Sequence, residues 1–206
     1  MNKSLSNEVY EFLLKRILSN ELLPGELINR RNIAEEMGVS VAPVLEAMLN
    51  LEWEGFLESI PRKGTQIRIL KEADIKGQLI VREAIECQAA RMYCGKPVSR
   101  NQDKLLEMAR KVDNSQKSTM EDWEIEIKFH RSLVELANCS MLTREFDRIM
   151  KMYLFYSMNR VIPNAEQIRR DNHIKLVNDL QTTDSDEGER IIRNHLLVGK
   201  EYFFKL

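Results

Sequence analysis

Residues 29–69 restrict the fold of this chain more than any other segment, because a helical pattern there changes abruptly to a strand pattern. Apolar residues at helical spacing predict one helix that ends at Gly38 and a second that opens at Ser40. Gly38 can adopt the left-handed conformation that ends a helix, and Ser40 is a favourable N-cap for the next one. Residues 56–60 and 66–69 then have the composition of two strands. The order of these elements predicts a winged helix-turn-helix.

The turn between the two predicted strands has the sequence Pro61-Arg62-Lys63-Gly64, so the hairpin carries a basic tip that contains a glycine. A helix-turn-helix that is followed by a basic wing is a unit that lies on duplex DNA. We therefore expect double-stranded DNA to be a partner of this chain.

The same segment resembles a known family. Leu23-Pro24-Gly25, Ile33-Ala34-Glu35, Gly38-Val39-Ser40 and Glu54-Gly55 are similar to the DNA-binding domain of the GntR family of bacterial transcription regulators, over about residues 5–70. The resemblance implies that the helix from Ser40 enters the major groove and that the wing tip enters the adjacent minor groove. Carried over by position, it makes Arg31, Ser40 and residues 62–64 candidate contacts to operator DNA.

Two positions depart from the family pattern. Val41 and Leu45 stand where the family usually has arginine, so the helix from Ser40 to Leu51 carries no positive charge. Residues 1–70 contain eight lysines and arginines against ten glutamates, a net charge of −2. We predict readout of thymine methyl groups through Val41 and Ala42, beside a local basic edge. The predicted DNA-binding residues are Arg30, Arg31, Ser40, Val41, Ala42, Arg62, Lys63 and Gly64. The alternative is that DNA recognition is lost and that the chain acts through protein partners.

After Lys71 the strand signals end and amphipathic helices follow. Helices are predicted over residues 72–93, 99–117, 121–137, 140–160, 164–181 and 185–204. Short connections indicate mostly antiparallel neighbours. The predicted fold is therefore mostly α, with a DNA-binding domain over residues 1–70 and an antiparallel bundle of about six helices over residues 71–206. Trp53 and Trp123 are predicted to pack in the interior.

All three histidines of the chain, His130, His173 and His195, belong to the predicted bundle. Glu126 lies one helical turn before His130, so both side chains project from one face. Three imidazoles and one carboxylate that converge in a bundle suit a divalent transition metal. On spacing alone, ordinary core or surface histidines are the alternative.

A second resemblance bears on these residues. The segments around Arg82-Glu83, Glu126-His130, His173-Val177 and His195-Leu196 are similar to the FCD effector domain of the FadR subfamily, and six helices resemble its VanR-like branch. The resemblance implies that Glu126, His130, His173 and His195 hold a metal, with zinc or nickel as the expected ion. The family has aspartate where this chain has Glu126.

The resemblance further implies that a small carboxylate effector binds beside the metal. Arg82 matches an arginine of the family's effector cavity and can clamp a carboxylate through two parallel hydrogen bonds. The alternative for Arg82 is a salt bridge to Glu86 or Glu83.

The composition limits the other classes of function. The chain has 206 residues and a net charge of −1, without an apolar run that approaches the ~20 residues of a membrane span. Its three cysteines lack metal-binding spacing and fit the reducing cytoplasm. We therefore predict a cytoplasmic, homodimeric, ligand-responsive repressor that is not an enzyme. The alternatives are a metalloenzyme that uses the histidine site, and the regulator without DNA recognition.

Overall fold

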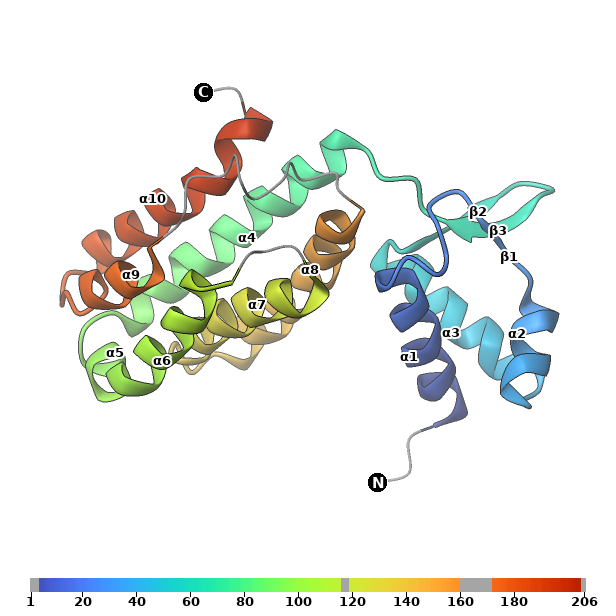
Figure 1. The fold of residues 1–206 in the computed structure, drawn as a ribbon, viewed down its shortest axis with the longest axis horizontal. Helices are drawn as coiled ribbons and strands as arrows, with labels where there is room; N and C mark the ends of the chain where they lie inside the picture. Colours follow the sequence, from blue (N-terminus) through green and yellow to red (C-terminus); the bar gives the residue numbers. More distant parts are fainter. Residues whose placement is uncertain (1–3, 116–118, 160–171, 205–206) are drawn as a thin grey trace. The chain divides into compact units, whose positions relative to one another are not determined.

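The structure, a computed structural model, describes residues 4–115, 119–159 and 172–204, and side chains as far as residue 197. The chain divides into two compact units between Lys71 and Glu72. Both are mainly helical, which confirms the mostly α fold (Figure 1).

The first unit is a helix-turn-helix with a wing. Its elements are α1 (Leu5–Leu18), β1 (Leu27–Ile28), α2 (Arg30–Met37), α3 (Val41–Glu54), β2 (Leu57–Ile60) and β3 (Gly64–Ile67). Asn29 caps α2 by accepting hydrogen bonds from the backbone N–H groups of Arg31 and Asn32. Gly38 ends α2 with a φ of 65°, and Gly55 ends α3 with a φ of 93°, so both breaks use the left-handed conformation that glycine allows.

The wing belongs to a three-stranded antiparallel sheet with the order β1-β3-β2. The hairpin pairs Ile60 with Gly64, and its tip places Arg62 at a φ of 65°. The strand β1, which pairs Leu27 with Gln66, was not predicted. Two residues are too few to show the alternation by which a strand is recognised in a sequence.

The core of the first unit lies between α1, α3 and the sheet. Its fully buried members are Val9, Leu13, Ile17, Val44, Ala47, Leu51, Phe56 and Ile67. Glu54 joins α3 to α1 by accepting a 2.6 Å hydrogen bond from the Tyr10 hydroxyl. The prediction that Trp53 packs in the interior is wrong, because this side chain is 78% exposed on the side of α3 away from the buried stripe. Trp123, in the second unit, is buried as predicted.

The second unit is a helical bundle. Its helices are α4 (Glu72–Tyr93), α5 (Lys96–Arg100), α6 (Gln102–Asp113), α7 (Met120–Glu135), α8 (Ser140–Met158), α9 (His173–Asp179) and α10 (Ser185–Phe204). The described residues thus form seven helices instead of about six, because α5 precedes the helix predicted from residue 99. The chain breaks at Asn101, whose side-chain amide donates to the carbonyl of Pro97. The first part of the helix predicted over 164–181 lies outside the described residues.

The long helix α4 is the centre of this bundle, where it packs against α10, α7 and α8 (Figure 1). Helices α4 and α10 approach closely because Gly188 lacks a side chain, and a Cβ atom there would lie 2.9 Å from Cβ of Cys94. Helix α6 packs against α7 and α9. Among the described residues, no helix combines the length and the hydropathy that crossing a membrane requires.

Candidate metal centre and DNA-facing surface

Three histidines from three helices of the bundle meet in one place. His130 comes from α7, His173 from the first turn of α9 and His195 from α10. One ligand atom from each residue lies within 4.8 Å of the others, and the ring centroids are 4.8 to 5.7 Å apart. The structure therefore brings together the three imidazoles that the sequence places far apart.

His130 is held by a carboxylate on its Nδ1 side. The side chain is fully buried, and Nδ1 lies 2.6 Å from Oε2 of Glu86 in α4. Nε2 is also buried and has no hydrogen-bond partner in the described part of the chain. A buried imidazole nitrogen without a hydrogen bond is costly unless another group binds it. Nε2 is therefore the atom that His130 would offer to a metal.

His173 has the same arrangement with a different carboxylate. Its Nδ1 lies 2.7 Å from Oδ1 of Asp113, the last residue of α6. The Asp113 carboxylate also accepts hydrogen bonds from the backbone N–H groups of His173 and Ile174, so it fixes the start of α9. Carboxylates that hold the Nδ1 side of metal-binding histidines are common in metal sites, where they set the orientation of the ring.

His195 completes the cluster in a neutral form. Burial of its imidazole, and after that electrostatic interaction with His130 and His173, lower the pKa of His195 well below its usual value. A metal binds the neutral imidazole, so a histidine that resists protonation is a suitable ligand. One ring nitrogen from each of the three histidines would suit a divalent transition metal that keeps further coordination positions open.

Glu126, the fourth predicted ligand, lies near the histidines but does not belong to their group. Its side chain is buried on α7, and its charge acts on both Arg82 and His195. Its oxygens are not among the ligand atoms that lie within 4.8 Å of one another. Direct ligation by Glu126 stays a prediction.

Arg82 is buried next to the cluster and forms an ion pair. Its Nε donates a 2.6 Å hydrogen bond to Oε1 of Glu86, and its guanidinium lies 5.0 Å from the centre of the Tyr153 ring. The salt bridge that the sequence left open as an alternative is therefore present.

Glu86 and Asp113 are the residues of this site that sequence reasoning missed. Glu86 uses one oxygen for Arg82 and the other for His130. Burial acts to raise the pKa of Glu86, but His130 and Arg82 outweigh it and lower the pKa to about 2. Glu86 is thus an ionised group that links the arginine to the histidine cluster. Its spacing from Arg82 was a signal for the ion pair, but not for the contact with His130.

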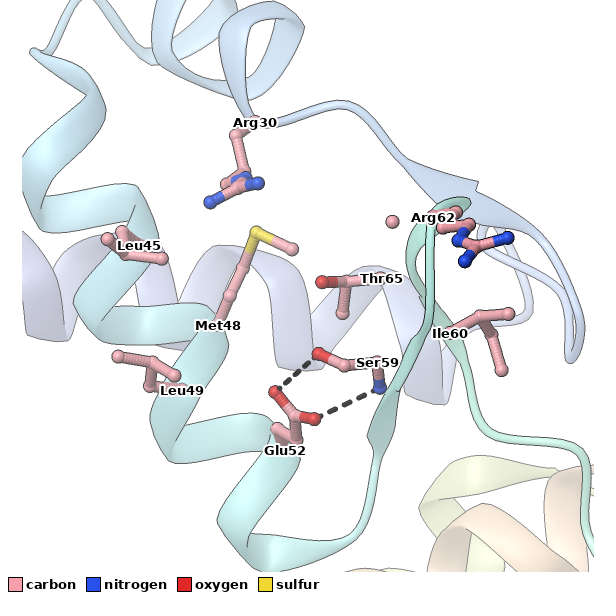
Figure 2. A pocket seen from close by; sticks show the side chains of 10 residues that line it. Arg30, Leu45, Met48, Leu49, Glu52, Ser59, Ile60, Arg62 and Thr65 are labelled. Atoms are coloured by element: carbon pink, nitrogen blue, oxygen red, sulfur yellow. Dashed lines mark hydrogen bonds between the residues drawn. The ribbon is translucent and has the colours of Figure 1, made fainter.

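All eight predicted DNA-binding residues are exposed in the first unit. Ser40 occupies the N-cap position of α3, but its hydroxyl makes no capping hydrogen bond. A groove of about 280 Å³ lies between α3 and the wing (Figure 2). Leu45, Met48 and Leu49 line it on the side of α3, and Arg30 and Arg62 also belong to its walls.

Glu52 fixes the distance between α3 and the wing. Its carboxylate accepts hydrogen bonds of 3.0 and 3.1 Å from the backbone N–H and the hydroxyl of Ser59, as Figure 2 shows. The groove therefore lies between two elements that are tied together.

Comparison with known proteins covers both units. Residues 5–67 match the family described as bacterial regulatory proteins, gntR family, and residues 79–197 match the FCD domain. The chain is 25% identical over 202 residues to the HTH-type transcriptional repressor RspR of Escherichia coli, a match that covers 93% of this chain and 86% of that protein. It is 26% identical over 203 residues to a protein of Paenarthrobacter nicotinovorans named "Probable D-xylose utilization operon transcriptional repressor", covering 94% and 86%. The crystal structure of a GntR transcriptional regulator from Rhodococcus sp. RHA1 has the same fold, with 19% identity, a TM-score of 0.74 and coverage of 98% and 99%.

Proposed function

This chain belongs to the gntR family of bacterial regulatory proteins and carries an FCD domain, and from this premise we propose that it is a homodimeric repressor that senses a small organic acid at a metal site. The domains and relatives identify a DNA-binding transcription regulator rather than an enzyme. The observation that carries the sensing role is the histidine cluster, with carboxylates on the Nδ1 side of two of its members.

The residues present fit a metal. His130, His173 and His195 would be the ligands, and Glu126 is the nearby carboxylate that we propose as the fourth. The buried Nε2 of His130 supports this assignment, since a metal ion would satisfy it. Zinc or nickel accepts this set of donors. The ion would supply open coordination positions to a carboxylate oxygen.

Arg82 is the group that would hold the effector. Its Nε is engaged with Glu86, so the two terminal nitrogens of the guanidinium would donate to the carboxylate of a small acid. The ring of Tyr153 beside the guanidinium limits how far Arg82 can turn. The site would therefore select a small, negatively charged ligand.

Two copies of the chain would bind a pseudo-palindromic operator in the bacterial cytoplasm. Ile80, Val81 and Met92 are large apolar side chains that are 43 to 56% exposed on α4, and exposed apolar groups of this size support an interface between copies. An effector that prefers one arrangement of the dimer would shift the population toward it by its differential affinity. Repression would be relieved when that arrangement fits the operator poorly.

The first test is binding of the purified dimer to the DNA upstream of its own gene over a salt series. We expect tight binding whose affinity falls steeply as salt rises, since the contacts of Arg30, Arg31, Arg62 and Lys63 with phosphates release counterions. Fluorescence polarisation of a labelled duplex measures both the affinity and the salt slope. Random DNA of equal length is the control, and equal affinity for the two duplexes would contradict operator recognition.

A conservative change at Arg82 tests the effector site. Lysine retains the positive charge beside Glu86 but lacks the planar fork, so Arg82→Lys is expected to keep the metal content and to weaken binding of a small carboxylate at least about tenfold. Calorimetric titration of a panel of small organic acids, with metal analysis of the same samples, makes the measurement. Unchanged affinity for an acid that binds the unaltered protein would remove Arg82 from the effector site.

A further inference from the structure

The helix α3 presents a second apolar face, in addition to the one that packs in the core. Val41, Leu45, Leu49 and Trp53 follow one another at intervals of four residues and are 44, 40, 55 and 78% exposed. The buried stripe of α3 consists of other residues, namely Val44, Ala47, Met48 and Leu51. Four large apolar side chains in a row on an exposed helix are unusual without a binding partner.

The groups around this row indicate the partner. Arg30 and Arg62 line the same groove as Leu45 and Leu49, and Figure 2 shows the two leucines along α3 with Arg30 at the start of α2 and Arg62 at the wing. Arg31 and Lys63, next to them in the sequence, are also exposed. Cations on two elements that flank an apolar row are complementary to a duplex, whose phosphates border a groove. An apolar peptide would not use these charges.

The side chains of α3 restrict which base groups this helix can recognise in the major groove of DNA. From Val41 to Leu49 no side chain carries a hydrogen-bond donor, so guanine O6 and adenine N7 cannot be recognised there in the usual way. The only base group in the major groove that suits an apolar side chain is the C5 methyl of thymine. The geometry points to α3 as a reader of thymine methyl groups, through Val41, Leu45 and Leu49, in an operator rich in A·T pairs. This inference rests on the proposed DNA binding and specifies what that binding recognises.

The test begins with duplexes that the full-length protein selects from a random library. We expect enrichment of thymine at defined positions of each half-site. Each enriched thymine is then replaced by deoxyuridine, which removes only the C5 methyl and leaves the pairing edge and the phosphate unchanged. Each contacted methyl should account for about a fourfold change in affinity, the factor that corresponds to burying one methylene-sized apolar group.

Variants of α3 assign the effect to the proposed side chains. Leu45→Ala and Leu49→Ala should lower the affinity for the thymine duplex and abolish the difference between thymine and deoxyuridine at one position each. Leu5→Ala is the matched control, because Leu5 is 55% exposed on α1 and lies outside the row. Arg62→Ala should weaken binding to both duplexes equally and reduce the salt slope, since a phosphate contact does not distinguish the bases.

The possible outcomes distinguish a failure of thymine readout from a failure of the proposed repressor function. Thymine readout is overturned if binding depends on salt but the affinity is the same for thymine and deoxyuridine duplexes, or if the selected sites are rich in G·C pairs. Either result leaves the proposed repressor function standing. Failure of the folded dimer to bind any selected or random duplex contradicts the proposed repressor as well as the readout.

Discussion

Replacing His173 with alanine is expected to strip the metal from the protein and to lower its thermal stability. The change removes one of three clustered imidazoles and leaves the Asp113 carboxylate without the ring that it holds. Loss of an outer partner alone typically costs about 10–100-fold in metal affinity, so loss of a ligand should cost more than about 100-fold. A metal present at 1,000 times its dissociation constant adds about 4 kcal/mol to the folded state, and the variant should lose most of this contribution.

The measurement is metal analysis of the purified variant, together with its melting temperature before and after chelation. The unaltered protein should lose stability with a chelator, whereas His173→Ala should respond little. Lys175→Ala is the matched control, since Lys175 lies exposed on the same helix and pairs with Asp179 at the surface. Retention of metal at the level of this control would exclude the histidine cluster as the binding site.

Local sequence signals predicted the DNA-binding unit in detail because each of its breaks depends on a residue with an unusual backbone preference. Gly38 and Gly55 end their helices in the left-handed conformation, as glycine at these positions indicates. The strand β1 was not predicted, because it is only two residues long and is defined by its pairing with the distant strand β3. Helix α5 was not predicted because the helix expected from the sequence begins at residue 99, whereas Pro97 lies in the first turn of α5, a position that tolerates proline.

Only those parts of the candidate site could be predicted that depend on spacing along one helix or on a family pattern. The histidines were identified in advance, and the structure places them together. Glu86 and Asp113 were not identified, because their contacts with His130 and His173 join residues 44 and 60 positions apart. Trp53 was predicted to be buried on the basis of its residue type, but its position on α3 faces away from the core. Packing between helices, which sequence periodicity does not specify, decides the contacts of Glu86 and Asp113. The position of Trp53 off the buried stripe of α3, in contrast, follows from helical spacing.

Replacing Glu86 with glutamine is expected to destabilise the bundle by about 3–5 kcal/mol, the usual cost of leaving a buried charge without its partner. Arg82 and Glu86 are both almost fully buried, and their ion pair is 2.6 Å long. Glutamine has the same shape but no charge, and it replaces one acceptor oxygen with an amide donor that faces either Arg82 or His130. Urea unfolding of the metal-free protein measures the loss of stability. Titration with the metal should also show a decrease of about 10–100-fold in affinity, because His130 loses the group that orients its ring.

Two further variants separate the structural role of Glu86 from its role in the metal site. Glu83→Gln, one turn earlier on α4, breaks an ion pair with Arg193 that is more exposed and should cost no more than about 1 kcal/mol. The double variant Arg82→Met with Glu86→Leu removes both charges, so most of the stability should return, since apolar pairs often replace buried ion pairs without loss. Its metal affinity should stay low, because His130 still lacks its carboxylate. If the double variant bound metal as tightly as the unaltered protein, Glu86 would serve only to neutralise Arg82, and the proposed link from effector arginine to metal ligand would fail.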